Sequence, residues 1–544
     1  MANGKSTSPA SQWVPLPGSN RQLLPQSVPI GPADLKATVA LTVKVRSRGK
    51  LAELDDAVKK ESAKPLKERT YISREELAQR YGADADDLDK VELYANKHHL
   101  RVADRDEATR RVVLKGTLED ALSAFHADVH MYQHASGPYR GRRGEILVPA
   151  ELKDVVTGIF GFDTHPKHRA PRRLMGTSSG TATNLGEFAS EFATRYQFPT
   201  SSSSTKLDGT GQCIALIELG GGYSNNDLKI FFSEAGVPMP KVVAVSIDHG
   251  ANHPTPQGLA DGEVMLDIEV AGVVAPGAKL AVYFAPNSDS GFQDAIRAAV
   301  HDGARKPSVV SISWGEPDDF LTAQSVQSYH EIFTEAAALG VTVCAASGDH
   351  GVADLDALHW DKRIHVNHPS SDPLVLCCGG TQIDKNVDVV WNDGTPFDPQ
   401  VFGGGGWASG GGISPVFGVP DYQKGLPMPS SLSTSQPGRG CPDIAMTADN
   451  YRTRVHGVDG PSGGTSAVTP LMACLVARLN QAFEKNLGFV NPLLYANAQA
   501  FTDITQGTNG INQTIEGYPA GKGWDACTGL GAPIGTVLLQ ALGK

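Results

Sequence analysis

The 544-residue sequence contains no apolar run that approaches the roughly 18 residues of a membrane-spanning helix. Its opening stretch, residues 1–19, also lacks the apolar core of a secretory signal, so neither a membrane span nor a signal peptide is recognisable. Cysteine is scarce: the seven residues are odd in number and include no Cys-x-x-Cys pair. We therefore expect most of them to be buried as small apolar residues rather than joined in a disulfide framework or a metal cluster.

Basic residues are scarce after residue 180. Residues 1–180 hold 29 Lys and Arg against 23 Asp and Glu, and residues 181–544 hold 19 against 36, so the net charge of −11 divides into +6 and −17. The acidic part is a poor candidate for nucleic-acid binding, because such binding draws its affinity from Lys and Arg on phosphates. The opposite charges instead predict that the N-terminal part is attracted to the rest of the chain at neutral pH, and that acid weakens this attraction.

The chain divides by composition into four stretches. Residues 1–32 are rich in Ser, Pro, Gly and Gln and are predicted to form a flexible arm. Residues 33–166 alternate strand and helix patterns, which favours a compact α+β domain of the split-βαβ type. Residues 167–185 are basic and rich in Ser, Thr and Gly, as expected of an exposed linker that is open to proteolysis. Residues 186–544 form the remaining domain.

Short apolar runs of strand length alternate with helical patterns in residues 186–544. Strands are predicted at 212–219, 242–247, 279–285, 308–314, 341–347 and 373–378, and helices at 227–236, 262–274, 292–303 and 326–340. This order predicts a doubly wound, mostly parallel α/β sheet that is buried on both faces, with sites at the carboxyl ends of its strands. The Gly-rich stretch 403–412 is followed by no Lys-Ser or Lys-Thr pair, so it indicates a surface or cleft-edge segment rather than a phosphate loop.

The clearest chemical signal is a serine at the start of an apolar helix. Ser466 follows a run of small residues, and Pro470 and a long apolar stretch follow it. A serine in the first helical turn lies near the positive end of the helix dipole, which stabilises a developing alkoxide or oxyanion. Pro470 is compatible with this position because the first N–H groups of a helix need no partner within it. An ordinary N-cap serine would give the same pattern.

Two carboxyl groups lie four residues apart on a predicted helix. Glu263 and Asp267 share one helix face, with about 5 to 6 Å between Cβ atoms, and residues 261–278 contain no basic residue. Carboxyls that are held together share a proton and titrate at separated pH values. The alternative is a solvated acidic helix face, although the apolar neighbours of the pair leave little of this helix polar.

A third candidate, Asp349, follows the predicted strand 341–347. It lies on a loop at a carboxyl strand end, where it either points into a cleft beside Ser466 or is an ordinary turn aspartate between glycines.

Gly-Thr-Ser followed by a Pro and an apolar helix resembles the nucleophile segment of subtilisins, yet the sequence has no His-Gly-Thr-His segment. A Ser-His-Asp peptidase would therefore use another histidine, such as His249 or His350, and would favour neutral pH.

Six segments, in family order, resemble the sedolisin family of serine-carboxyl peptidases. They are CIALIELGGGY, DGEVMLDIEVAG, SVVSISWG, the Gly348-Asp349 loop, GGTSAV and WDACTGLG. The resemblance covers nearly all of residues 33–544. It implies a subtilisin-like catalytic domain and an N-terminal ferredoxin-like prodomain that acts as an intramolecular chaperone and inhibitor.

The resemblance also implies a role for each candidate residue. Ser466 would be the nucleophile, Glu263 its general base and acid, and Asp267 the carboxyl that orients Glu263. Asp349 would be the oxyanion-hole acid. Two further residues would extend the hydrogen-bonded network behind the pair: Glu218 and Trp314.

The same resemblance implies one Ca²⁺ ion near the C-terminus. Its ligands would be two carboxylates and three backbone carbonyls: Asp503, Asp525, Ile504, Gly521 and Gly523. These are hard oxygen donors, which suit Ca²⁺ rather than Zn²⁺. Aspartates in Gly-rich turns are common, so the site depends on the resemblance.

The expected activity is acid hydrolysis of peptides and proteins by a monomeric zymogen that is processed between residues 168 and 190; the resemblance also implies export. In acid a histidine is protonated and useless as a base, whereas a carboxyl still exchanges protons, and Asp349 can donate a hydrogen bond only while protonated. Where the family commonly has Ser, His350 follows Asp349, and its positive charge is expected to lower the pKa of that carboxyl. The alternative outside the enzymes is a non-catalytic binding protein of the same fold.

Overall fold

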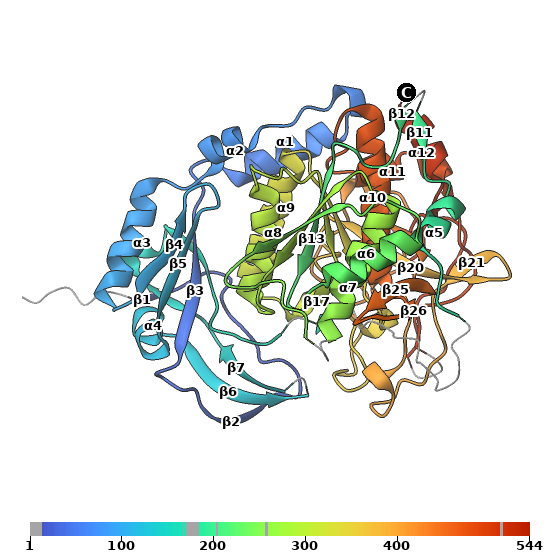
Figure 1. Ribbon diagram of the computed structural model, residues 1–544. Coiled ribbons are helices and arrows are strands. Elements are labelled where there is room, and N and C mark those ends of the chain that lie inside the picture. The colour runs from blue at the N-terminus through green and yellow to red at the C-terminus, as the bar shows by residue number, and fades with distance from the viewer. Residues whose placement is uncertain are drawn as a thin grey trace, which may run out of the picture. The chain divides into compact units, whose positions relative to one another are not determined.

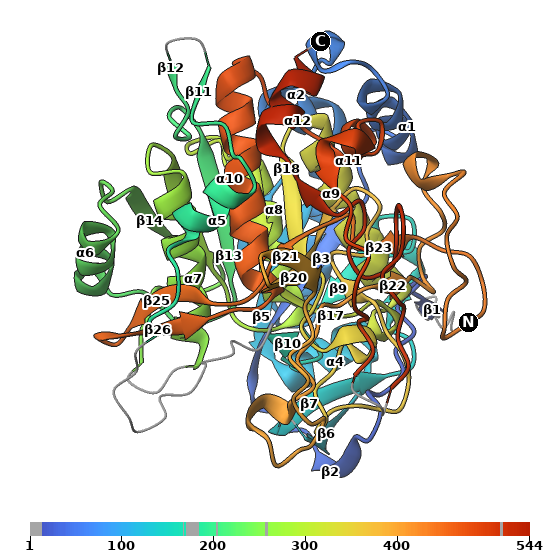
Figure 2. The ribbon, with the colours of Figure 1, turned by 90° about the vertical axis from the view of Figure 1, so that its right-hand side faces the viewer.

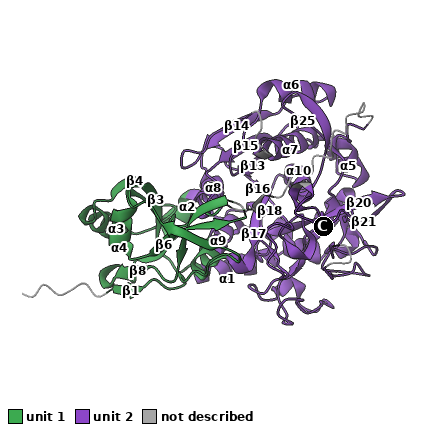
Figure 3. Cartoon of the chain, turned by 90° about the horizontal axis from the view of Figure 1, so that it is seen from below, with its two compact units in different colours: residues 1–51, 75–165, 321–328 green, residues 52–74, 166–320, 329–544 purple. Residues whose placement is uncertain are grey.

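The computed structural model describes residues 13–135, 137–166, 168–169, 184–202, 205–255, 259–511 and 515–543. Its internal contacts divide the chain into two compact units (Figure 3). Unit 1 comprises residues 1–51, 75–165 and 321–328, and unit 2 comprises residues 52–74, 166–320 and 329–544. The sequence pattern predicted a single division near residue 166, whereas residues 52–74 group with unit 2 and residues 321–328 with unit 1.

Unit 1 has the α+β composition expected for residues 33–166. A four-stranded antiparallel sheet has the order β4 (Arg101–Asp106), β5 (Arg111–Thr117), β3 (Thr38–Val45) and β9 (Val156–Phe160). A second sheet joins β2 (Val28–Pro32), β6 (Asp128–His134) and β7 (Gly137–Arg143). The helices are α2 (Arg74–Tyr81), α3 (Ala85–Lys97) and α4 (Leu118–Phe125). Helix α4 begins at a capping box between Thr117 and Asp120, which satisfies N–H groups that the first turn leaves free.

Residues 13–32 do not form the flexible arm that the sequence predicted. Strand β1 (Trp13–Pro15) pairs with β8 (Leu147–Pro149), and β2 pairs with β6. Leu16 and Leu24 are buried. The prediction failed because the partners of this segment lie about a hundred residues or more away in the sequence, and local composition contains no information about them.

Unit 2 contains the predicted doubly wound sheet. Its path is β14 (Lys241–Ser246), β15 (Lys279–Phe284), β13 (Cys213–Glu218), β16 (Val309–Ile312), β18 (Thr342–Ala346), β20 (Leu376–Asp384) and β21 (Val387–Val390), and β24 (Ile444–Thr447) also pairs with β20. All pairs are parallel except β20 with β21. The sequence predicted every strand of the sheet to be fully buried, but β14 is a half-exposed edge strand.

Helices cover both faces of this sheet (Figure 1). Helices α7 (Leu259–Val274) and α10 (Thr465–Phe483) pack together on one face, and α8 (Asp289–His301) and α9 (Ala323–Ala338) cover the other. Figure 2 shows α10 running beside the central strands. The other helices of this unit are α5 (Ala189–Arg195), α6 (Asn225–Glu234), α11 (Asn491–Tyr495), α12 (Gly535–Leu542) and most of α1 (Leu51–Ser62). No helix in the described part of the chain has the length and apolar character that a membrane crossing requires.

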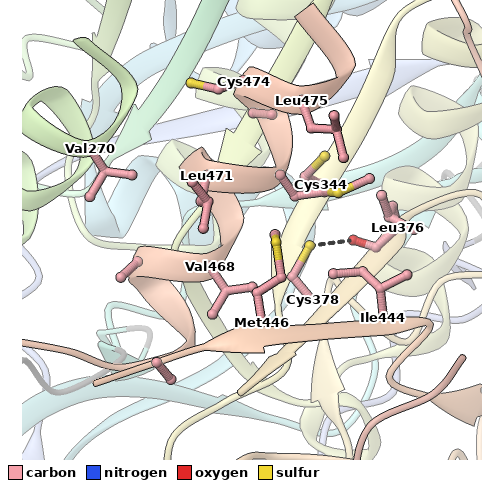
Figure 4. Packing of buried hydrophobic residues seen from close by; sticks show 14 of the residues in the cluster. Val270, Cys344, Leu376, Cys378, Ile444, Met446, Val468, Leu471, Cys474 and Leu475 are labelled. Atoms are coloured by element: carbon pink, nitrogen blue, oxygen red, sulfur yellow. Dashed lines mark hydrogen bonds between the residues drawn. The ribbon is translucent and has the colours of Figure 1, made fainter. Parts of the chain in front are cut away.

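The core between α10 and the sheet contains several of the cysteines. Figure 4 shows Val468 and Leu471 of α10 close to Cys344 of β18 and Cys378 of β20. All seven cysteines are buried and free. The expectation that most of them act as small apolar residues is therefore confirmed.

Short strands border the sheet where it carries the candidate residues. Strand β17 (Trp314–Pro317) pairs antiparallel with β10 (His168–Arg169) on one side and with β19 (Asn367–His368) on the other. Of the predicted linker 167–185, only His168–Arg169 and residues 184–185 are described; the rest lies outside the described residues.

Candidate active site

The candidate residues lie at the carboxyl ends of adjacent strands and at the start of α10. Glu218 is the last residue of β13, Trp314 follows β16, and Asp349 follows β18. In an open parallel sheet this edge forms the ligand-binding side, next to the point where strand order reverses. The order β15, β13, β16 contains that reversal.

Ser466 is the second residue of α10 and is almost completely buried. The helix is capped by Gly464, so Ser466 is not an N-cap serine. Its Oγ has no hydrogen-bond partner among the described residues. A buried hydroxyl that is left free at a helix N-terminus can attack a substrate without first breaking a hydrogen bond, and the helix dipole favours the alkoxide.

Pro470 has a different role from the one expected. It is the sixth residue of α10, so its missing N–H leaves the Ser466 carbonyl without the usual i→i−4 bond. The Ser313 hydroxyl lies 3.4 Å from that carbonyl oxygen. Pro470 thus frees a main-chain acceptor beside the candidate nucleophile, and a side chain from the sheet edge reaches it.

Glu263 and Asp267 are buried rather than solvated. The Ser313 Oγ lies 3.0 and 3.1 Å from the two carboxyl oxygens of Asp267, so one hydroxyl connects the carboxyl pair with the backbone of Ser466. The Trp314 indole donates to Glu218 Oε2 at 3.1 Å. A solvated acidic helix face is therefore excluded, because Glu263, Asp267 and Glu218 are each 2% exposed or less.

Burial dominates the electrostatics of this carboxyl cluster. It raises the pKa of Glu218 well above its ordinary value, and the charge of Glu263 raises it further. Burial likewise raises the pKa of Asp267, with added contributions from Glu218 and Glu263. Glu218 and Asp267 are therefore neutral in acid, where each can hold a proton next to Glu263.

Asp349 contacts the first residue of α10, Thr465. Its Oδ1 accepts hydrogen bonds from the backbone N–H and the hydroxyl of Thr465, both at 2.7 Å. Its Oδ2 has no hydrogen-bond partner among the described residues. A Cβ at Gly464, where φ is +119°, would lie 2.5 Å from Oδ2, so only glycine fits beside this oxygen. Burial raises the pKa of Asp349 to about 7, and the Thr465 hydrogen bonds offset part of that increase.

The expectation that a charged His350 lowers the pKa of Asp349 is wrong. The His350 ring stacks on Trp407 at 4.8 Å, and Nδ1 lies 3.2 Å from the Gly405 carbonyl oxygen. Burial lowers the pKa of His350 to about 4, so the ring is neutral between about pH 4 and about pH 7, where Asp349 still holds its proton. His249 lies in the turn after β14 with φ of +70°. No histidine in the described ranges bonds to the Ser466 hydroxyl, as a Ser-His-Asp arrangement would require.

Two contributors to this geometry were not singled out from the sequence, Ser313 and Thr465, and the 403–412 segment was expected at the surface or the edge of a cleft. Gly410 N donates to the Gly348 carbonyl at 2.8 Å, and Ala408 N donates to the Asp349 carbonyl at 3.0 Å. This part of the segment is buried behind the Asp349 loop rather than exposed on the surface. A Cβ at Gly410 would lie 1.9 Å from the Ser347 carbonyl oxygen. Ser313 could have been found from its place beside Trp314, and Thr465 from its place beside Ser466.

The predicted calcium ligands lie on two segments, residues 503–504 and 521–525, which a hydrogen bond between Gly523 and Asp503 joins. Asp503 Oδ2 accepts from Gly523 N at 2.9 Å, and Asp525 Oδ2 accepts from Gly521 N at 3.0 Å. The buried Asp525 also accepts at Oδ1 from the backbone of Cys527 and Thr528. No ion pair joins either aspartate to a basic side chain within the described ranges. The remaining predicted ligand, Ile504, is buried. Two carboxylates with neighbouring main-chain carbonyls are a set of oxygen donors that fits a hard divalent cation.

Known proteins resemble both parts of the chain. The family model described as "Pro-kumamolisin, activation domain" matches residues 25–165, and that of the subtilase family matches residues 246–509. Kumamolisin from Bacillus sp. (strain MN-32) is 42% identical over 546 residues, which cover 97% of this chain and 96% of that protein. Sedolisin from Pseudomonas sp. (strain 101) is 27% identical over 532 residues, which cover 91% of this chain and 85% of that protein.

A solved structure shares the fold as well. Pseudomonas sedolisin, titled a serine-carboxyl proteinase complexed with two molecules of pseudo-iodotyrostatin, superposes with a TM-score of 0.55 at 27% identity. The match covers 66% of this chain and 98% of that chain. The subtilisin-like fold expected from the sequence is thereby confirmed. With an activation domain at residues 25–165 and close similarity to kumamolisin over nearly its whole length, the chain belongs to the sedolisin family of serine-carboxyl peptidases.

Proposed function

We propose that this chain is an acid-active endopeptidase, made as a self-processing zymogen, that hydrolyses peptide bonds through an acyl-enzyme on Ser466. One observation carries the proposal. Ser466, whose hydroxyl has no hydrogen-bond partner among the described residues, lies in the first turn of a buried helix whose start contacts Asp349. Ser313 joins that cluster to the Ser466 backbone. A structural protein has no evident use for buried, unsatisfied groups of this kind in one place.

Glu263 acts as the general base and then as the general acid. It takes the proton of Ser466 Oγ as the hydroxyl attacks the substrate carbonyl carbon, and it gives that proton to the leaving amine when the C–N bond breaks. Water then repeats the sequence, attacks the ester and restores the serine. Asp267 orients Glu263, and Glu218 with its Trp314 partner extends the same network.

Asp349 donates a hydrogen bond to the oxyanion. Because Oδ1 already accepts two hydrogen bonds from Thr465, the proton of the neutral carboxyl belongs on Oδ2, the oxygen that lies against Gly464. Donation is possible only while the carboxyl is protonated, which holds below its pKa of about 7. This supports activity in acid and loss of activity above neutral pH.

The linker supports self-processing. The backbone of His168–Arg169 pairs antiparallel with β17, in the register His168 with Gly315 and Arg169 with Trp314. Trp314 donates to Glu218, so His168–Arg169 adds a two-residue strand to the segment that contains Trp314. The processed bond lies between residues 168 and 190, and the substrates are peptides and proteins that bind in extended form. Export, which the family resemblance implied, stays a prediction.

One Ca²⁺ ion is proposed for the C-terminal loop. Asp503 and Asp525 would hold it together with the carbonyl oxygens of Ile504, Gly521 and Gly523. A bound Ca²⁺ would supply the positive charge that the two carboxylates lack among the described residues. Its role would be to fix the loop, since none of these residues belongs to the candidate active site.

The decisive experiment is a shift of the purified full chain from about pH 7 to about pH 4. Wild type is expected to cleave itself between residues 168 and 190 and then to hydrolyse casein, whereas Ser466→Ala stays full-length and inactive. Ser233→Ala, an exposed serine on α6, is the matched control and should behave as wild type. A Ser466→Ala chain that still matures alone would refute the assignment of the nucleophile.

A further inference from the structure

A segment of the activation domain is built into the peptidase unit. Residues 52–74, here called the strap, lie in the sequence range of the activation domain but group by their contacts with unit 2 (Figure 3). The strap contains most of α1 and a short 3₁₀ turn, η1 (Leu66–Glu68). Leu66 is buried in the same hydrophobic cluster as the residues of α7 and α10. The strap is therefore anchored in the core of unit 2.

Arg69 is the central anchor. Its side chain is 1% exposed, and its Nη1 donates to the carbonyls of Leu487 at 2.9 Å and Phe489 at 2.8 Å. Other guanidinium nitrogens donate to two carbonyls of the strap itself, those of Ser62 and Lys64. All four acceptors are neutral main-chain oxygens. Hydrogen bonds from a charged donor are among the strong ones, and these do not depend on a carboxylate.

The strap residues after Arg69 repeat this chemistry. Tyr71 donates to the Leu487 carbonyl at 2.8 Å, and its ring lies where a Cβ on Gly340 or Gly488 would clash at 2.6 and 2.7 Å. Arg74 donates to the carbonyls of Val300 at 2.8 Å and Pro307 at 3.1 Å.

A backbone bond adds to these side-chain contacts. Ile72 N donates to the Ala338 carbonyl at 3.1 Å. The hydrogen bonds that Arg69, Tyr71, Ile72 and Arg74 donate to the rest of unit 2 thus share one type of acceptor, the main-chain carbonyl, which does not titrate.

Ionisable groups lie around these anchors. On the strap, Asp55 pairs with Lys59, and Glu61 accepts from Lys64 and from Thr70. From unit 2, His330 lies 3.8 Å from Asp55 and 2.9 Å from Asp372, which is the main reason that its pKa rises to about 9. Two further charged groups face the strap: Lys485, which donates to the Lys67 carbonyl, and Asp421, whose charge acts on Lys59. With a pKa of about 9, His330 is protonated both at pH 7 and at pH 4, so its charge does not change between them.

We propose that the carbonyl groups of Val300, Pro307, Ala338, Leu487 and Phe489 form a docking surface for the strap that holds the activation domain on the peptidase in acid and after the linker has been cut. The order of events rests on the proposed function, in which the linker is cleaved first. Loss of the attraction between oppositely charged parts then does not release the activation domain. Release requires a second cleavage, within or beside the strap.

The test separates docking from self-processing. A recognition sequence for a site-specific protease is placed in residues 174–183 of the Ser466→Ala chain, and the linker is cut at about pH 7 by the added protease. Dilution series on a size-exclusion column at about pH 7 and about pH 4 then give the dissociation constant of the N-terminal fragment. We expect co-elution at both pH values, with dissociation constants within about threefold of each other. Separation at pH 4 of fragments that stay together at pH 7 would overturn the proposal.

Variants identify the anchor. Arg69→Gln should weaken retention at least tenfold at both pH values, and Tyr71→Phe, which loses one hydroxyl, about fivefold. Arg46→Gln is the matched control, because Arg46 forms an ion pair with Asp87 within unit 1. If Arg69→Gln does not fold, Tyr71→Phe alone decides: retention equal to wild type would contradict the role of the strap. If the wild-type chain fails to cleave itself in acid, that failure counts against the proposed function. The measured retention of the N-terminal fragment by the Ser466→Ala chain is not affected by it.

Discussion

Replacement of Asp349 by asparagine tests whether a protonated carboxyl sets the upper pH limit of activity. In the wild type, Oδ1 accepts both Thr465 hydrogen bonds, and the proposed mechanism puts the proton on Oδ2. An asparagine of the same shape can keep Oδ1 in place and put its amide N–H₂ where Oδ2 lies. The variant thus retains a donor for the oxyanion but loses the titration.

The magnitude follows from the pKa of Asp349, which burial raises to about 7. The protonated fraction is about 0.999 at pH 4, about one half at pH 7 and about one tenth at pH 8. The kcat of the wild type should therefore fall about tenfold per pH unit above pH 7. Asp349→Asn should stay within roughly tenfold of wild type in acid, whereas Asp349→Ala, which lacks a donor, should lose about 10²- to 10³-fold in kcat.

The assay is kcat on a synthetic peptide from about pH 3 to pH 9. All chains are activated by an added protease at two engineered sites, one in the linker and one beside the strap, so neither cleavage depends on the variant's own activity. The control is His350→Gln, because a His350 of pKa about 4 is neutral near pH 7 and its loss should leave the upper limb in place. An upper limb that persists in Asp349→Asn, or a wild-type limb centred near pH 4, would refute the reasoning.

Three further predictions concern neighbouring features. Ser313→Ala should lower kcat about tenfold with little change in KM, because it removes the hydroxyl between Asp267 and the Ser466 carbonyl. Ser308→Ala, at the other end of β16, is the control. An unchanged kcat in Ser313→Ala would contradict this role. The Ser466→Ala chain should melt at a higher temperature at pH 4 than at pH 8. Its buried carboxyls, Glu218, Asp267, Asp318, Asp349 and Asp354, have raised pKa values in the folded state, so their contribution is full below about pH 4 and is lost as pH rises toward those values. Asp349 alone, raised from 3.8 to about 7, contributes about 4 kcal/mol to this difference, and equal melting temperatures in calorimetry would speak against it. Chelation by EGTA should lower the melting temperature of wild type but not of Asp503→Asn. Calorimetric Ca²⁺ titration should find one site in wild type and none in that variant. The control, Asp421→Asn, changes a surface pair with Lys424 and should bind Ca²⁺ as wild type does.

Much of the peptidase unit could be predicted from the sequence because its signals are local. Apolar runs located six of the eight strands of the central sheet, and the spacing of Glu263 and Asp267 placed both carboxyls on one helix face. The glycines and strand before Asp349 placed it at a strand end. These features depend on neighbours within a few residues, which a pattern can detect.

The errors arose where distant residues decide the environment. His350 was expected to be charged, but Trp407 and Gly405, more than fifty residues later, bury it. Residues 13–32 acquire structure only by pairing with β6 and β8. The strap follows the same rule, because two of the four carbonyl acceptors of Arg69 lie more than four hundred residues downstream.

The backbone clamp on the Asp349 loop limits how the enzyme could be retuned. Gly410 and Ala408 hold the loop through peptide N–H groups, and the 1.9 Å approach at Gly410 leaves no room for a side chain. Peptide groups are not exchanged by mutation, so the position of the Asp349 backbone is almost closed to gradual adjustment. Directed evolution of the pH range should therefore act on side chains that change the burial of this carboxyl, and a library centred on residues 408–410 should yield inactive chains rather than shifted ones.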